Sequence, residues 1–151
     1  MFMILFFILL LSFETHGSTT TDIESRPLSF IQLIKNNLNT RTFAIKDRKT
    51  MEQVGYIDTS FDDNKTIQIN RFEIEESHRG QGYGFQGLKA LLNILKPRVA
   101  DEDIMIRLIV WKDNIPAIKL YTKMGFEKCS GKELIEGYLW MSRTIGKDYR
   151  G

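Results

Sequence analysis

The sequence contains a single cysteine, Cys129, among its 151 residues. One cysteine excludes an internal disulfide framework and offers no cysteine pair for a zinc site, so we predict no bound metal. We expect the Cys129 side chain to be a small buried hydrophobic group. An excess of charge is also missing, because the formal net charge is +2. Nucleic-acid-binding proteins usually carry a concentrated basic face, so we expect no nucleic-acid partner.

The apolar run at the N-terminus is too short to cross a membrane as a helix. Met1 to Phe13 would span roughly 20 Å, against a hydrocarbon core of ~30 Å. A signal peptide has an apolar region of this length, and Thr15 to Gly17 places small residues at a plausible cleavage site. No Lys or Arg precedes the run, so the basic start of a signal peptide is missing.

We therefore favour a signal peptide in residues 1–17, with an uncleaved membrane anchor or a wrongly chosen start codon as alternatives. A signal or anchor implies export or membrane association, with membrane contact through this segment alone. Without either, the expected location is the cytoplasm.

The rest of the chain predicts one α/β domain preceded by a connecting segment. Residues 18–24 are small and polar, which is typical of a linker, and Phe30, Ile31, Ile34 and Leu38 recur at helical spacing. We therefore expect a linker and an N-terminal helix in residues 18–41, followed by the main domain in residues 42–146. Polar turns separate three expected strands that form an antiparallel meander. These strands are Thr42–Lys46, Gln53–Asp58 and Lys65–Ile74.

The second half of the domain alternates helices and strands. One apolar stripe predicts a helix containing Leu88, Leu91, Leu92 and Leu95. The run Ile104–Val110 is almost continuously apolar, which suits a strand covered on both faces. A second helix is predicted by Ala117, Leu120, Tyr121 and Met124, with Gly125 just beyond its end. The last expected strands are Phe126–Cys129 and Tyr138–Ser142.

A glycine-rich loop, Arg79-Gly80-Gln81-Gly82-Tyr83-Gly84, precedes the leucine-striped helix. Glycine lets the backbone turn sharply and approach a ligand without interference from a Cβ atom. The free N–H groups at the start of a helix carry partial positive charge and suit a pyrophosphate. Arg79 can add a charge-assisted contact. The loop therefore predicts a phosphate-binding site, with a turn that binds no ligand as the alternative.

The glycines also match the dinucleotide pattern G-x-G-x-x-G at Gly82, Gly84 and Gly87. That pattern should follow its strand directly and be followed about 20 positions later by an acidic residue. Here residues 75–81 separate the strand from the glycines, and the acidic residues 101–103 precede the next strand instead of ending it. No Lys-Ser or Lys-Thr pair follows the glycines, so the nucleotide P-loop is absent too. Both nucleotide motifs are disfavoured.

A second motif lies on the later helix, and each of its residues has a structural explanation when taken alone. Its residues are Asn114, Ala117, Leu120, Tyr121, Lys123, Gly125 and Phe126. Together with the loop, this N-x-x-A-x-x-L-Y-x-K-x-G-F pattern resembles the GNAT superfamily of acetyl-CoA-dependent N-acetyltransferases. The loop pattern of that superfamily, Q/R-x-x-G-x-G/A, is matched by Arg79, Gly82 and Gly84. The resemblance covers roughly residues 42–143.

The resemblance implies a mixed, mostly antiparallel sheet with two splayed central parallel strands, flanking helices, and acetyl-CoA entering between the strands. The backbone near Glu73 would pair with the pantetheine arm, the loop amides would hold the pyrophosphate, and Asn114 would help to place the cofactor or substrate. Tyr121 would protonate the leaving thiolate, since the reference pKa of tyrosine, near ~10, keeps it protonated at pH 7. The implied cofactor-binding residues are Phe72, Ile74, Arg79, Gly80, Gln81, Gly82, Tyr83, Gly84, Phe85 and Asn114.

The general base and the acceptor are less constrained. Some members of the superfamily carry a glutamate base five positions before the motif asparagine, where this chain has Ile109. Glu73 is the expected base, with Glu75, His78 or a water chain as alternatives.

The acceptor class is left open among a small amine, a polyamine, a peptide N-terminus and a lysine. A non-catalytic acyl-CoA-binding module and an interaction domain without cofactor are the alternatives to an enzyme, because fold alone does not decide function.

Overall fold

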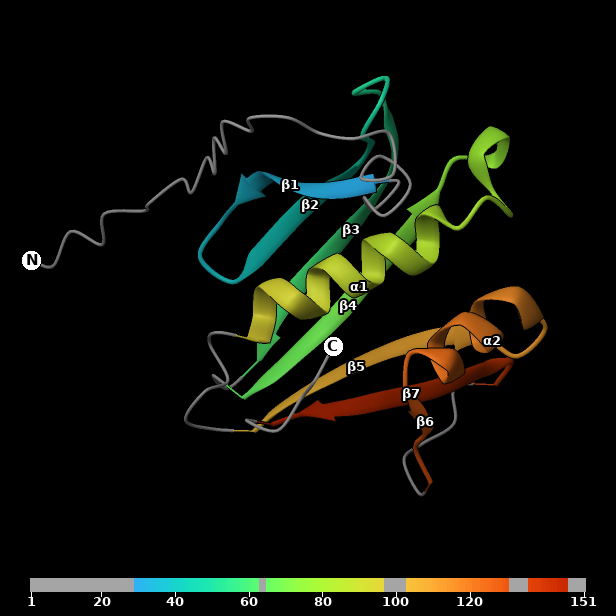
Figure 1. The fold of residues 1–151 in the computed structure, drawn as a ribbon. Coiled ribbons are helices and arrows are strands. Elements are labelled where there is room, and N and C mark those ends of the chain that lie inside the picture. The colour runs from blue at the N-terminus through green and yellow to red at the C-terminus, as the bar shows by residue number, and fades with distance from the viewer. Residues whose placement is uncertain (1–28, 63–64, 97–102, 131–135, 147–151) are drawn as a thin grey trace, which may run out of the picture.

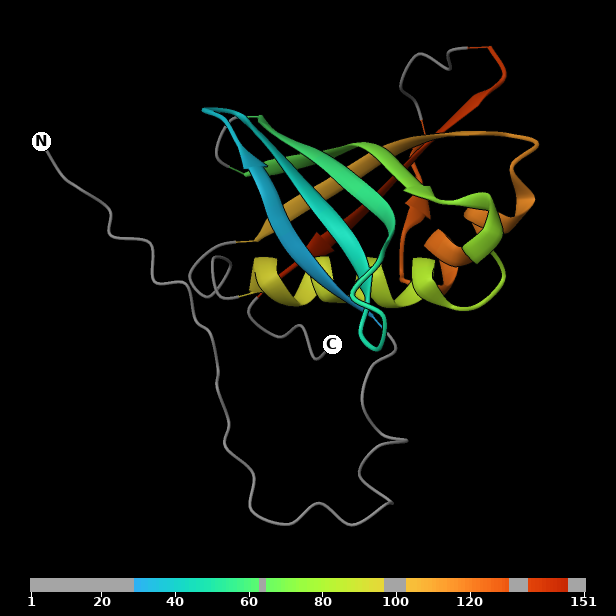
Figure 2. The ribbon, with the colours of Figure 1, turned by 90° about the horizontal axis from the view of Figure 1, so that it is seen from above.

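The computed structural model describes residues 29–62, 65–96, 103–130 and 136–146. Within these residues, seven strands form one sheet, and two α-helices cover one of its faces (Figures 1 and 2). The elements in chain order are β1 Ser29–Asn36, β2 Thr40–Asp47, β3 Gln53–Asp62, β4 Thr66–Ile74, the short 3-10 helix η2 Glu76–His78, α1 Tyr83–Leu95, β5 Ile104–Trp111, α2 Ile115–Lys123, β6 Glu127–Lys128 and β7 Tyr138–Ile145.

The strand order in the sheet is β1-β2-β3-β4-β5-β7-β6. Strands β1 to β4 form an antiparallel meander, and β7 runs antiparallel to both β5 and β6. The exception is the central pair, in which β4 and β5 run parallel. Helix α1 makes the connection between these two strands, as a parallel crossover requires. The predicted mixed, mostly antiparallel α/β sheet with a central parallel pair is therefore confirmed.

One hydrophobic core lies between the helices and the sheet. The predicted leucine stripe of α1 is its centre, because Leu88, Leu91 and Leu92 are fully buried. Burying each such side chain stabilises a fold by about 1.5–3 kcal/mol.

The expectation that β5 is covered on both faces is wrong. Ile106 and Leu108 are buried against the helices, whereas Met105 is 45% exposed, because α1 and α2 pack on the same face.

The predicted N-terminal helix is also wrong where the structure describes it. Residues 29–36 form strand β1, which pairs antiparallel with β2. A β-bulge at Ile34, between Leu33 and Lys35, shifts the register. The extra residue disturbs the alternation that would have indicated a strand, while pairing with β2 supplies the backbone hydrogen bonds. The linker, the start of the predicted helix and the N-terminal apolar run lie outside the described residues. No helix that the structure describes is both long and apolar enough to span a bilayer.

Cys129 departs from its predicted burial, since it is half-buried. It follows β6, a two-residue strand at the edge of the sheet, so fewer neighbours cover it. Its thiol lies 3.2 Å from the hydroxyl of Ser142, to which it donates a weak hydrogen bond.

Candidate active site

The parallel strands β4 and β5 separate partway along their length. They pair from Thr66 opposite Met105 to Ile69 opposite Leu108, and β4 then continues beside β3 alone. The separation begins at a bulge, since the β3 residues Asp58 and Thr59 pair with Arg71 and Ile69 and leave Asn70 as the extra residue. A bulge bends its strand and increases its twist. The result is the splay visible between β4 and β5 in Figure 1, which we call the wedge.

The glycine loop lies at the open end of the wedge and leads into α1. Gly80 and Gly82 have φ angles of 75° and 92°, in the left-handed region that favours glycine. The first helical hydrogen bond of α1 runs from the Gln86 amide to the Gly82 carbonyl. The amides of the first turn precede this bond and have no acceptor within the helix, as at any α-helix start. The loop therefore has the geometry of an anion-binding site.

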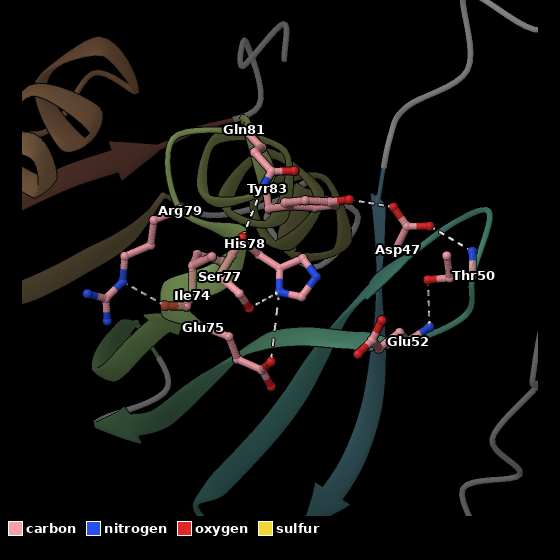
Figure 3. A network of polar contacts seen from close by, with 10 residues as sticks. All are labelled: Asp47, Thr50, Glu52, Ile74, Glu75, Ser77, His78, Arg79, Gln81 and Tyr83. Atoms are coloured by element: carbon pink, nitrogen blue, oxygen red, sulfur yellow. Dashed lines mark hydrogen bonds and ion pairs between the residues drawn. The ribbon is translucent and has the colours of Figure 1, made fainter.

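Side chains of the loop hold its backbone in this shape (Figure 3). The Arg79 Nε atom donates to the Ile74 carbonyl oxygen at 2.9 Å, and the Gln81 amide donates to the Ser77 carbonyl oxygen at 3.0 Å. The guanidinium of Arg79 is thereby kept at the end of β4.

A cavity of about 230 Å³ lies between β4, the glycine loop and α2. Eight of the predicted site residues line it, namely Phe72, Ile74, Arg79, Gly80, Tyr83, Gly84, Asn114 and Tyr121. Four do not, namely Glu73, Gln81, Gly82 and Phe85. The sequence-based prediction of cofactor-binding residues did not include four further wall residues, namely His78, Pro116, Ala117 and Leu120. Ala117 and Leu120 belong to the recognised motif, so its inward helical stripe was the available signal.

Gly84 lies where the glycine loop meets α2. A Cβ atom at this position would lie 3.3 Å from Leu120 Cδ2, 3.7 Å from Ile74 Cγ1 and 3.8 Å from Phe72 Cζ. All three contacted side chains line the cavity, so a larger residue at Gly84 would project into it.

Helix α2 is fixed at both ends by the residues that the motif predicts. Asn114 is its N-cap, with its side-chain oxygen accepting from the Ala117 amide at 3.2 Å. Gly125, with a φ angle of 77°, follows its C-terminal end. Asn114 therefore caps α2 and also lines the cavity.

Tyr121 reaches the cavity from α2 and is 7% exposed. Its ring centroid lies 6.3 Å from that of Phe72 on β4 and 5.8 Å from that of Phe126. Burial raises the pKa of its hydroxyl from 10.0 to about 12. The phenol therefore stays protonated throughout the neutral range and can donate a proton or a hydrogen bond.

Glu73, the expected general base, lies on the face of β4 opposite to the cavity. Its neighbours Phe72 and Ile74 line the cavity, and successive side chains on a strand point to opposite faces. One Glu73 carboxylate oxygen accepts a hydrogen bond from the Tyr56 hydroxyl at 2.9 Å and lies 3.8 Å from Arg71 Nε. Burial and this carboxylate raise the pKa of Tyr56 above its usual value. Glu73 is thus held on the open face of the sheet.

His78 lies in the cavity wall beside the glycine loop. Its Nδ1 atom is 2.9 Å from the Ser77 hydroxyl and 3.8 Å from a carboxylate oxygen of Glu75. Its ring packs edge-on against Tyr83, with centroids 5.7 Å apart (Figure 3). The two alternative bases named from the sequence are therefore next to each other, and of the two only His78 lines the cavity.

Similar folds are found among solved structures. An acetyltransferase of the GNAT family from Elizabethkingia anophelis with acetyl-CoA bound has a TM-score of 0.58 at 17% identity, over 71% of this chain and 77% of that one. The ribosomal-protein-S18-alanine N-acetyltransferase from Escherichia coli has a TM-score of 0.60 at 18% identity, over 74% and 72% of the two chains. At these identities the likeness concerns the fold.

Sequence comparison gives a relative and a family. Spermine/spermidine N(1)-acetyltransferase of Bacillus subtilis (strain 168) is 37% identical over 68 residues. This match covers 44% of the chain and 43% of the relative, so it spans less than half of the relative's length. The Acetyltransferase (GNAT) family matches residues 8–126, well over half of the chain and including both motifs. The chain therefore belongs to the Acetyltransferase (GNAT) family.

Proposed function

We propose that this chain transfers the acetyl group of acetyl-CoA to a primary amine. The observation that carries the proposal is the cavity between β4, the glycine loop and α2, whose wall contains both residues of the glycine loop and Tyr121. An anion-binding helix start suits the pyrophosphate of acetyl-CoA, and a protonated phenol can donate to its departing sulfur.

The residues present fit this substrate. Phe72, Ile74 and Leu120 provide apolar walls for an extended arm, and the missing Cβ atom of Gly84 keeps the space between them open. The amides at the start of α1 would bind the pyrophosphate, and Arg79 lies beside them. Acetyl-CoA itself supplies an acetyl thioester, which is activated toward nucleophiles.

In the proposed reaction a C–N bond forms to the amine and the thioester C–S bond breaks. Holding both reactants in place supplies much of the rate. Tyr121 is the proposed general acid that donates its proton to the departing sulfur, and its raised pKa keeps that proton available. The amine must lose a proton to a base or to water.

We propose Glu73 as that base, because it lies on the open face of the sheet, from which an acceptor can approach while the cofactor occupies the helix side. A carboxylate at Glu73 would also attract a cationic amine. Ile109 carries no titratable group. His78 lines the cavity beside the glycine loop, toward the proposed pyrophosphate site, and Glu75 lies next to His78.

The acceptor is tested by following release of free coenzyme A over a panel of amines. The panel contains spermine and spermidine, after the Bacillus subtilis relative, together with small monoamines and peptides with a free N-terminus or lysine. We expect acceptor-dependent release with at least one class, strongly reduced in Tyr121→Phe. Binding of acetyl-CoA without acceptor-dependent release across the panel would instead support the alternative, a non-catalytic acyl-CoA-binding module. The observation that favours this alternative is the apolar Ile109.

A further inference from the structure

Asp47 lies at the end of β2, outside the cavity wall, yet its carboxylate contacts a residue of the glycine loop. Its side chain is buried, with 6% of the residue exposed. Aspartate is seldom buried without a partner. Asp47 Oδ2 accepts a hydrogen bond from the Tyr83 hydroxyl at 2.5 Å, and Figure 3 shows the two side chains pointing toward each other.

The other carboxylate oxygen holds the turn between β2 and β3. Asp47 Oδ1 accepts from the backbone amides of Lys49 and Thr50, both at 2.7 Å. The Tyr83 hydroxyl, followed by the Thr50 amide, lowers the pKa of Asp47 from 3.8 to about 2. The carboxylate is therefore ionised at neutral pH and ties the β2–β3 turn to the start of α1.

Tyr83 is well placed to transmit this contact to the loop. It is the first residue of α1, directly follows Gly82, and lines the cavity. One turn later, a Cβ atom at Gly87 would lie 2.8 Å from Ile45 Cδ1, so the helix approaches β2 closely there as well. Helix α1 thus rests on β2 at two points, Tyr83 on Asp47 and Gly87 on Ile45.

We propose that Asp47 is a positioning residue for acetyl-CoA, which acts through Tyr83 by fixing the direction of the first-turn amides of α1. This inference rests on the proposed function, in which those amides bind the pyrophosphate. A site that is ordered before binding loses less freedom when the ligand arrives, so its affinity is higher. Removing the hydrogen bond between Tyr83 and Asp47 should therefore weaken binding of acetyl-CoA. It should leave the proton transfer from Tyr121 unchanged.

The test is Tyr83→Phe, which keeps the ring and removes the hydroxyl. We measure the Kd of acetyl-CoA by calorimetry and kcat and KM with the best acceptor. We expect Kd and KM to rise about threefold to tenfold, which is less than the full loss of a hydrogen bond to a charged group, because the bond orders the loop and does not contact the ligand. We expect kcat at saturating acetyl-CoA to stay within about twofold, since Tyr121 is untouched.

Thr50→Ala is the matched control. It removes the 3.3 Å hydrogen bond from the Glu52 amide to Thr50 Oγ1 and the small side-chain contribution of Thr50 to Asp47, and it leaves the Tyr83 hydroxyl and the turn amides on Asp47. It should lower thermal stability slightly without changing Kd. Asp47→Asn is the second variant, because Asn can still accept from the turn amides through Oδ1, whereas its NH2 group can only donate to the Tyr83 hydroxyl, so the hydrogen bond to a charged acceptor is replaced by a weaker neutral one.

Asp47→Asn should raise Kd by less than Tyr83→Phe does. The double variant should bind acetyl-CoA no more weakly than Tyr83→Phe alone, because both changes remove the same hydrogen bond to the Asp47 carboxylate. If Tyr83→Phe does not fold, Asp47→Asn alone gives the same measurement. Unchanged Kd in both single variants, additive effects, or an equal rise in Thr50→Ala would overturn the inference while leaving the proposed function intact. Failure of the unmodified chain to bind acetyl-CoA would overturn both.

Discussion

The ring of Tyr121 on α2 faces that of Phe72 on β4, with their centroids 6.3 Å apart. Phe72 lies beyond Ile69, the last residue of β4 that pairs with β5. The two rings therefore meet where the sheet has opened, and both line the cavity. This relationship places the proposed acid beside the point where the wedge begins, and the glycine loop lies farther along it.

Substitutions at Gly84 should weaken binding of acetyl-CoA in order of side-chain size. Gly84→Ala places a Cβ atom 3.3 Å from Leu120 Cδ2, a contact that a small shift of the leucine can relieve. Gly84→Val adds two methyl groups toward Ile74 and Phe72, which would fill part of the cavity. We expect a modest loss of affinity for alanine and a loss of at least about tenfold for valine, measured by calorimetry. Equal affinity in Gly84→Val and the unmodified chain would refute this site for the cofactor.

Acid should destabilise the fold through Asp47. Its pKa in the folded protein is about 2, below the ordinary value of 3.8, so the folded state binds the proton less tightly. The carboxylate therefore contributes its stabilisation in full above the unfolded pKa and loses it as the pH falls through the folded pKa. We expect the free energy of unfolding to fall between about pH 4 and pH 2 through this group.

Tyr83→Phe removes the largest cause of the lowered pKa of Asp47, so its loss of stability over this interval should be smaller. Urea unfolding of both proteins at several pH values measures the difference, and the other carboxyl groups cancel in the comparison. Identical pH dependence of the two proteins would show that the hydroxyl does not hold the carboxylate in solution.

Residues 1–17 are proposed to be a signal or anchor that takes no part in the fold. A chain beginning at Ser18 should then unfold cooperatively at nearly the same temperature as the full chain, as followed by circular dichroism. The family match begins at residue 8, inside the apolar run. Comparing the unfolding temperatures of the two chains therefore tests whether the run contributes to the domain. Loss of cooperative unfolding in the shorter chain would show that the run belongs to the core.

The helices were predictable from the sequence because each buries one regular stripe. Leu88, Leu91 and Leu92 on α1 recur at helical spacing and are fully buried. The strand β1 was not predictable in this way. Its bulge at Ile34 interrupts the alternation of apolar and polar residues. Its conformation is set by pairing with β2, which the helical spacing of its apolar residues does not indicate.

The candidate site was predictable as far as its motifs extend. The loop glycines and Tyr121 were expected to serve one ligand, and Gly84 and Tyr121 line one cavity. The face on which Glu73 lies depends on the bulge at Asn70, because one inserted residue reverses which side chains point toward the helices. The contact between Asp47 and Tyr83 joins residues 36 positions apart, and only the packing of α1 on β2 brings them together.

Tyr121→Phe should separate the chemistry from binding. Phenylalanine keeps the ring that packs against Phe72 and Phe126 but has no proton to donate. General acids typically contribute ~10²–10⁴-fold, so kcat should fall at least about tenfold while the Kd of acetyl-CoA stays nearly constant. The pH profile of the unmodified enzyme is a second measurement. The pKa of Tyr121 is raised to about 12, so the acid keeps its proton as the pH rises toward 10. The rate should therefore rise with pH as the acceptor amine loses its proton, and loss of the proton on Tyr121 should not lower it on the alkaline side.

Steady-state rates and calorimetry must be measured on the same Tyr121→Phe protein, together with its unfolding temperature. A fall in both kcat and affinity would indicate damaged packing around α2, because the missing hydroxyl alone should leave the loop and the apolar walls in place. Unchanged turnover with the best acceptor would reduce Tyr121 to an aromatic residue of the core. The proton on the leaving sulfur would then have to come from water, and the alkaline part of the pH profile would no longer depend on this residue.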